Sequence, residues 1–128
     1  MHTDRILIAV GAVSAMVAVT AGAFGAHLLR ERLAADLLTV FETGARYQMY
    51  HALGLVAVGL ALGRGAGTPA LWAGWLFIVG SIIFSGSLYA LALTGARWWG
   101  AITPLGGVCF LLGWGLFAWG VLISKVTV

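Results

Sequence analysis

The sequence predicts an all-α membrane protein, a bundle of four transmembrane helices with an amphipathic interfacial helix between helices 1 and 2. The first reason is composition: 62% of the 128 residues are hydrophobic and only 9% are charged, whereas a soluble domain carries roughly 25% charged residues. The second is that the apolar residues fall into long runs separated by short polar segments. The third is a Thr-Pro pair at the start of two runs, a typical helix beginning.

The first run, residues 6–29, contains no Asp, Glu, Lys or Arg and exceeds the ~20 residues needed to cross a bilayer. Small residues near 21–24 resemble a signal-peptidase site, but the run is longer than the apolar core of a signal peptide. We therefore expect a retained helix. Residues 30–43 place polar side chains on one arc of a helical wheel and leucines on the other, which predicts an amphipathic helix lying in the membrane interface.

Three further spanning helices are predicted at about residues 47–62, 69–93 and 103–124. If the second is continuous with the interfacial helix, Gly44 is the expected bend. Thr68-Pro69 and Thr103-Pro104 mark the starts of the third and fourth, with threonine as the N-cap. All of these helices form one transmembrane domain, residues 1–128.

Four crossings place both termini on one side of the membrane. That side carries Arg5, Arg64 and Lys125, and the opposite side carries Arg30, Arg32, Arg46 and Arg97. Three basic residues against four do not define an orientation by the positive-inside rule.

Charge and cysteine content exclude several classes of protein. The net charge is +3 and the basic residues are scattered singly, which is typical of helix-end anchors at lipid headgroups and not of a nucleic-acid surface. The single Cys109 excludes an intrachain disulfide framework and a cysteine-based metal site. The expected partner is the lipid bilayer, with no nucleic acid.

Polar residues gather in one half of the predicted bundle. The ends of helices 1 and 3 and the starts of helices 2 and 4 share a membrane face, so the topology brings their polar side chains to one level. Such groups must find partners near hydrocarbon, which makes this half the candidate ligand site or polar cluster. Its members are His27, Glu42, Arg46, Tyr47, Gln48, Tyr50, His51, Ser85, Ser87, Tyr89 and Thr103.

Each part of this cluster has a structural and a functional interpretation. Glu42 and Arg46 are an acid and a base four residues apart, which favours a structural ion pair; the alternative is a site for a lipid headgroup or a small charged ligand. His51 is expected to hydrogen-bond within the bundle, to a serine of helix 3 or a tyrosine. His27 and His51 together are the pair that would ligate a haem or metal. Spacing specifies no third ligand, so we expect no resident metal or cofactor.

Glycines at helical spacing predict close helix packing. Gly106, Gly113 and Gly120 fall seven residues apart on helix 4, a flat line suited to one neighbour. On helix 1 the corresponding positions are Gly11, Gly22 and Gly25. These lines favour a protein that works through helix–helix contacts.

No catalytic motif is present: the sequence has no HExxH, GxSxG or P-loop, and its four acidic residues all lie outside the predicted spanning runs. A proton-coupled carrier normally needs a carboxylate in mid-membrane. We therefore expect a protein that is not an enzyme.

Four segments of the chain resemble the signature blocks of domain-of-unknown-function family 423. They are GAFGAHLL (22–29), FETGARYQMYHALGL (41–55), FSGSLYALALTG (84–95) and ITPLGGVCFLLGW (102–114). The family consists of small bacterial inner-membrane proteins and is similar to mitochondrial transmembrane protein 256. The resemblance covers essentially the whole chain and implies four membrane helices in the bacterial inner membrane, without implying an activity. The matching positions are the polar residues named above together with Pro104.

Two functions follow as hypotheses. The first is a structural or interaction protein, either a homo-oligomer or an accessory or assembly partner of a membrane complex. The alternative is binding or passage of a small ligand, a lipid, quinone or ion, at the polar half of the bundle. The alternative predicts a cavity lined by His27, Tyr47, His51, Ser85 and Tyr89.

Overall fold

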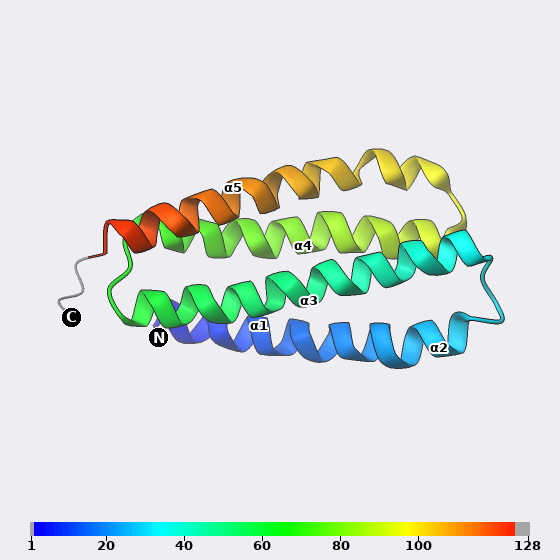
Figure 1. The fold of residues 1–128 in the computed structure, drawn as a ribbon, viewed down its shortest axis with the longest axis horizontal. Helices are drawn as coiled ribbons and strands as arrows, with labels where there is room; N and C mark the ends of the chain where they lie inside the picture. The colour runs from blue at the N-terminus through cyan, green and yellow to red at the C-terminus, as the bar shows by residue number, and fades with distance from the viewer. Residues whose placement is uncertain (1, 125–128) are drawn as a thin grey trace.

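A computed structural model describes residues 2–124, and within this range the chain forms helices and no strand. Four long helices run side by side along the long axis of the molecule, and the N-terminus lies at the same end as the C-terminal end of α5 (Figure 1). The arrangement agrees with the up-and-down topology expected from the sequence. Lys125, which we expected near the end of the last helix, lies outside the described residues.

The first long helix is continuous over Thr3–Leu29 but changes its winding near its end. It consists of α1 (Thr3–Val19), a π-helical segment η1 (Thr20–Gly25) and a short α2 (Ala26–Leu29). Asp4 lies in its first turn, where a carboxylate is favoured by the helix dipole. The predicted run of residues 6–29 thus forms one helix, with a widened turn that its composition did not indicate.

The helix predicted at 30–43 is not a separate element; of the two arrangements that the sequence left open, the structure has the continuous one. Residues 30–33 form a turn, and α3 begins at Ala35 and continues unbroken to Gly63. The helix is unbroken at Gly44. This glycine lets α4 (Thr68–Thr94) pack closely, since a Cβ atom there would stand 3.0 Å from the ring of Tyr89. The amphipathic segment is therefore the N-terminal part of a 29-residue helix.

The two remaining long helices begin at their Thr-Pro pairs, as predicted. They are α4 (Thr68–Thr94) and α5 (Thr103–Leu122), joined by a 3₁₀ helix η2 (Arg97–Ala101). The predicted threonine N-caps are wrong, because Gly67 and Ile102 occupy the cap positions and neither helix has a side-chain cap. Gly95 ends α4 with φ of 71°, the left-handed conformation that glycine adopts at helix ends.

The four helices form a row in chain order, and not a closed square. Packed interfaces join α1 to α3, α3 to α4, and α4 to α5, while α3 and α5 touch at few points and α1 and α5 form no packed interface. Figure 1 shows α1 with α2 along one edge and α5 along the other. A row leaves grooves between next-nearest helices, α1 with α4 and α3 with α5.

Glycines allow the backbones of neighbouring helices to approach closely. On α5, added Cβ atoms would stand 2.5 Å from the Phe84 nitrogen at Gly106, 2.7 Å from the Phe77 ring at Gly113 and 2.5 Å from the Ala70 nitrogen at Gly120. On α1, a Cβ at Gly11 would stand 2.7 Å from the Ala52 carbonyl oxygen. The glycine lines of both edge helices therefore face the neighbouring helix of the same chain.

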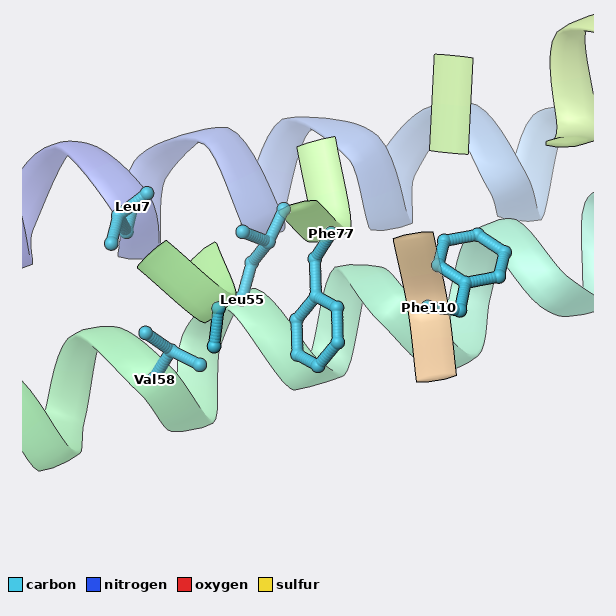
Figure 2. Close-up of a cluster of buried hydrophobic side chains, with 6 residues drawn as sticks. Leu7, Leu55, Val58, Phe77 and Phe110 are labelled. Atoms are coloured by element: carbon cyan, nitrogen blue, oxygen red, sulfur yellow. The ribbon is translucent and has the colours of Figure 1, made fainter. Parts of the chain in front are cut away.

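An apolar core runs across the row. It contains Leu7 from α1, Leu55 and Val58 from α3, Ala73 and Phe77 from α4, and Phe110 from α5. Figure 2 shows the Phe77 side chain between those of Leu55 and Phe110. All six side chains are buried, so this cluster fixes the register of the four helices.

Three of the long helices are long and apolar enough to cross a membrane: Thr3–Leu29, Thr68–Thr94 and Arg97–Leu122. Twenty-seven helical residues span about 40 Å, more than the ~30 Å of a hydrocarbon core. The helix α3 is as long, but it carries Glu42, Arg46 and Gln48 in its N-terminal half and His51 near its middle.

Candidate functional site

The structure divides the predicted polar cluster among several places. Because α3 lies inside the row, side chains on its two faces reach different grooves. Tyr47, Tyr50 and His51 face α5, Gln48 faces α1 and α4, and Glu42 and Arg46 lie beside α1.

The largest of the grooves, here called the aromatic groove, lies between α3 and α5 and has a volume of about 620 Å³. Six of its residues carry aromatic rings: Tyr47, Tyr50, His51, Phe84, Phe110 and Trp114. The others are Pro104, Gly107, Val108 and Leu111. Gly107 has no heavy atom within 4 Å of the position its Cβ would take, so the groove is open above this residue.

The His51 imidazole forms the floor of the aromatic groove and is fully hydrogen-bonded. Its Nδ1 lies 2.7 Å from the Tyr47 carbonyl oxygen, and the Trp114 indole N–H donates to its Nε2 over 3.0 Å. A carbonyl only accepts and an indole N–H only donates, so these partners select the neutral ring with the proton on Nδ1. The ring also stacks on Phe110, with centroids 3.4 Å apart. The predicted hydrogen bond of His51 within the bundle is confirmed; one partner is a tyrosine, through its backbone carbonyl, and the other is Trp114 and not a serine of α4.

Two tyrosine hydroxyls border the aromatic groove without a partner. Tyr47 and Tyr50 are 37% and 50% exposed, and their rings meet edge to face with centroids 5.5 Å apart. Within residues 2–124 neither hydroxyl makes a hydrogen bond. The groove therefore combines flat apolar walls with two free hydroxyl groups at one side.

A second groove, the serine groove, lies between α1 and α4 on the other face of α3, with a volume of about 410 Å³. Gln48 crosses its floor: its Nε2 donates to the Ser14 carbonyl oxygen at 3.1 Å, and its Oε1 accepts from the Tyr89 hydroxyl at 2.7 Å. The Ser81 hydroxyl oxygen faces the same groove, is buried and has no hydrogen-bond partner within the described part of the chain.

Two further predicted site residues, Ser85 and Ser87, form hydrogen bonds that join one helix to another. The Ser85 hydroxyl donates to the Gly44 carbonyl oxygen at 2.7 Å, which joins α4 to α3. The Ser87 hydroxyl donates to the Phe84 carbonyl oxygen at 2.9 Å and lies 2.6 Å from Thr103 Oγ1, which joins α4 to the start of α5. Both serines are buried, and their hydroxyls are satisfied by these partners.

A third groove, the charged groove, lies between α3 and the end of the first long helix and has a volume of about 380 Å³. It contains Glu42 and Arg46, but the predicted ion pair between them is wrong. Among the described residues the ion pair is instead Arg97 Nη2 to Asp36 Oδ2, at 2.8 Å, between η2 and the first turn of α3. The hydrogen bond from Arg97 lowers the pKa of Asp36 below its usual value of 3.8.

His27 lies apart from all three grooves. Its side chain is exposed at the end of α2 and makes no hydrogen bond or ion pair with any residue from 2 to 124. His51 has both nitrogens engaged near the middle of α3. The two residues do not form a ligand pair for a haem or metal, and within the described range no three His, Cys, Asp or Glu side chains gather as a metal site.

The sequence interpretation missed Trp114 and Ser14. Trp114 lies in the middle of α5, away from the interfacial level where tryptophan normally gathers, and an indole N–H at this depth needs an acceptor. Ser14 interrupts the otherwise apolar α1. A polar group in the middle of an apolar helix was the signal that could have found both residues.

The comparisons with known proteins agree with this membrane architecture. A family described as "Protein of unknown function (DUF423)" matches residues 21–107. A UPF0382 membrane protein of Staphylococcus saprophyticus is 51% identical over 86% of this chain and 91% of its own. The UPF0382 membrane protein YwdK of Bacillus subtilis is 46% identical over 86% and 90%, and the UPF0382 inner membrane protein YgdD of Escherichia coli is 38% identical over 96% and 94%.

No solved structure matches the chain. The membrane-protein relatives and the three long apolar helices together confirm the multi-pass membrane location that the sequence predicts.

Proposed function

Since the chain belongs to the DUF423 family of proteins of unknown function, we propose a function from its own geometry: it binds a lipophilic quinone in the aromatic groove between α3 and α5. The proposal includes α3 as the fourth membrane crossing, because α3 lies alongside three apolar helices of matching length (Figure 1). It also places the protein in the bacterial inner membrane, because its relative in Escherichia coli is named an inner membrane protein.

The observation that carries this proposal is the aromatic groove itself. Its volume of about 620 Å³ falls in the range of about 300–1,000 Å³ typical of small-molecule sites. A quinone head is a flat ring that stacks on aromatic side chains at separations of about 4.5–7 Å. Tyr47 on α3 and Trp114 on α5, which are 37% and 43% exposed, supply such surfaces on the two sides of the groove.

The polar atoms at the groove suit a ligand that accepts hydrogen bonds. Tyr47 and Tyr50 offer two hydroxyl donors with no protein partner in the described region. His51 offers neither a free donor nor a free acceptor, because both nitrogens are occupied. Quinone carbonyls accept from hydroxyls, whereas a cation would need oxygen acceptors that this groove does not concentrate.

Filling the groove at Gly107 tests the proposal. Gly107 and Gly115 lie on the same helix, and neither has a heavy atom within 4 Å of a Cβ. Only Gly107 lines the aromatic groove. Gly107→Leu therefore blocks the groove, and Gly115→Leu is the matched control that adds the same side chain elsewhere on α5.

The measurement is quenching of tryptophan fluorescence by a short-chain ubiquinone or menaquinone in nanodiscs. We expect saturable quenching in the wild type, at least about tenfold weaker binding in Gly107→Leu, and less than about twofold change in Gly115→Leu. Equal titrations for all three proteins would contradict the proposal. Tyr47→Phe removes one donor and is expected to weaken binding about threefold to tenfold.

Association through the free edge of α5 is a second candidate function. Gly106, Gly113 and Gly120 face α4, so they no longer argue for a second copy. Gly115 is different, because no heavy atom of residues 2–124 lies within 4 Å of the position its Cβ would take, and Leu112, three residues before it, is 56% exposed. Small residues of this kind allow helices of separate chains to approach in membranes.

Native mass spectrometry in mild detergent tests this second candidate. A homo-oligomer that Gly115→Leu dissociates is the expected result, with Gly107→Ala as the control on the same helix. A wild-type protein that remains monomeric, without a co-purifying membrane protein, excludes association through this edge.

A further inference from the structure

Glu42 and Arg46 are oppositely charged groups that the fold leaves without partners. They lie one helical turn apart on α3, in the order that favours an ion pair, yet neither forms an ion pair or a side-chain hydrogen bond with residues 2–124. Glu42 is half-buried, which raises the cost of leaving its carboxylate unpaired. Both charges line the charged groove and neither lines the aromatic groove, although Tyr50 borders both grooves.

The walls of the charged groove differ from one end to the other. Ala18, Gly22 and Ala45 form a flat floor of small residues, and Met49 and Tyr50 continue the groove along α3 toward the middle of the helix. Gly22 belongs to the π-helical segment η1. π-helical turns inside α-helices are frequent at functional sites. The groove thus has a charged head end and an apolar tail end.

The charges define the ligand. One carboxylate and one guanidinium on the same face call for a molecule with a cation and an anion at similar separation. Side chains four residues apart on a helix have Cβ atoms about 5–6 Å apart. The ammonium and phosphate of a phosphoethanolamine group are separated by a two-carbon link, which suits this spacing. A phosphate is the group that arginine binds in two-pronged geometry.

We propose that the charged groove is a binding site for a phosphatidylethanolamine molecule, with Glu42 accepting from its ammonium, Arg46 donating to its phosphate, and an acyl chain lying along Ala18 and Met49. An ammonium donates hydrogen bonds to the carboxylate, whereas the choline group has no N–H and glycerol has no positive charge. The site therefore distinguishes phosphatidylethanolamine from phosphatidylcholine and phosphatidylglycerol.

The test uses the full chain in nanodiscs that contain equal amounts of phosphatidylethanolamine, phosphatidylglycerol and phosphatidylcholine with the same acyl chains. Native mass spectrometry then counts the lipids retained after gentle delipidation. We expect the wild type to retain phosphatidylethanolamine about tenfold over the other two. Glu42→Gln is expected to remove this preference, and Arg46→Gln to reduce retention of all three lipids.

Two exposed residues in the turn before α3 provide matched controls, since Glu31→Gln and Arg32→Gln make the same chemical changes outside the groove. Both are expected to retain the wild-type lipid preference. Gly22→Leu fills the groove and keeps both charges, because a Cβ at Gly22 would meet only the Ala45 Cβ, at 3.6 Å. It should abolish the preference with an unchanged circular dichroism spectrum. Equal retention of the three lipids by the wild type, or a preference that survives both Glu42→Gln and Gly22→Leu, would overturn the proposal.

Discussion

Both halves of the molecule have close contacts at glycines, but the hydrogen bonds between side chains of different helices gather in one half. In the apolar half (residues 2–11, 55–77 and 115–124), glycines bring backbones together: a Cβ at Gly59 would stand 2.6 Å from the Asp4 carbonyl oxygen, and one at Gly120 would stand 2.5 Å from the Ala70 nitrogen. In the polar half (residues 12–54 and 78–114), Gln48 joins Ser14 to Tyr89, and Trp114 donates to His51.

Both halves leave room for a ligand, but only the grooves of the polar half lie beside these interhelical hydrogen bonds. Backbone contact at glycines leaves no space between two helices. The apolar half also has a groove, of about 430 Å³ between α3 and the end of α5, while the largest groove, of about 620 Å³, lies in the polar half. In a membrane, helix association depends on van der Waals packing and interhelical hydrogen bonds, so the two halves use these two contributions in different proportions.

Adding a methyl group to the apolar half is expected to have the largest effect on stability. Gly120→Ala pushes a Cβ atom against backbone of α4 that cannot rotate away, and such overpacking costs about 2 kcal/mol. Gly115→Ala, five residues earlier with nothing within 4 Å, is expected to be neutral or up to ~1 kcal/mol stabilising. Unfolding by sodium dodecyl sulfate in mixed micelles measures both. Equal effects of the two variants would show that α4 and α5 are not in backbone contact there.

Breaking the Gln48–Tyr89 hydrogen bond of the polar half is expected to have a smaller effect. The two side chains meet at 2.7 Å, and both line the serine groove. A double-mutant cycle of Gln48→Met and Tyr89→Phe should give a coupling energy of about 1 kcal/mol, since interhelical hydrogen bonds in membranes rarely exceed ~1.7 kcal/mol. A coupling near zero would mean that packing alone holds this half together.

Ser85→Ala sharpens the same comparison with a weaker interaction. The Ser85 hydroxyl donates to a backbone carbonyl, that of Gly44, which remains inside α3 when the hydroxyl is removed. We expect a loss of about 0.5 kcal/mol in the same unfolding assay. Ser87→Ala is the related variant. It removes a hydroxyl that joins α4 to Thr103 at the start of α5, and not to α3.

The exposed ion pair between Asp36 and Arg97 is expected to make the smallest contribution to the stability of the fold, and only within one pH range. Arg97 holds the pKa of Asp36 below 3.8 in the folded protein. The stabilisation is therefore present above pH 3.8 and is lost as the pH falls through the lowered pKa of the folded state. Thermal melting of the wild type and Asp36→Asn from pH 7 downward should show a small difference that closes at acid pH. High salt should also reduce it, because both side chains are exposed.

The sequence was sufficient to predict the helices but left open whether α3 is continuous. Long apolar runs and the two Thr-Pro pairs locate three spans within a few residues, because these signals are local. A change from polar to apolar composition at residue 46 suggested two helices. Helical hydrogen bonds do not depend on side-chain polarity, however, and a glycine inside a helix costs only about 1 kcal/mol. The helix therefore continues through Gly44, where Tyr89 packs.

The sequence predicts which polar residues lie at the same depth in the membrane, but not which of them line the same groove. Topology brings Tyr47, Gln48 and Ser85 to one half of the molecule, but successive helical residues point about 100° apart. Tyr47 and Gln48 therefore enter different grooves on different faces of α3. The glycines of α5 were ambiguous in the same way. Their spacing placed them on one face of the helix, but only the structure showed that this face packs against α4.

The quinone content of the protein isolated from its own membranes tests the central proposal most directly. Wild type, Gly107→Leu and Gly115→Leu are extracted in mild detergent, and lipophilic quinone per protein chain is measured by liquid chromatography and mass spectrometry. Occupation of the aromatic groove predicts a ratio near one quinone per chain for the wild type and Gly115→Leu, and a ratio at least about tenfold lower for Gly107→Leu. The same ratio in all three proteins, or no quinone in the wild type, would contradict the assignment of this groove.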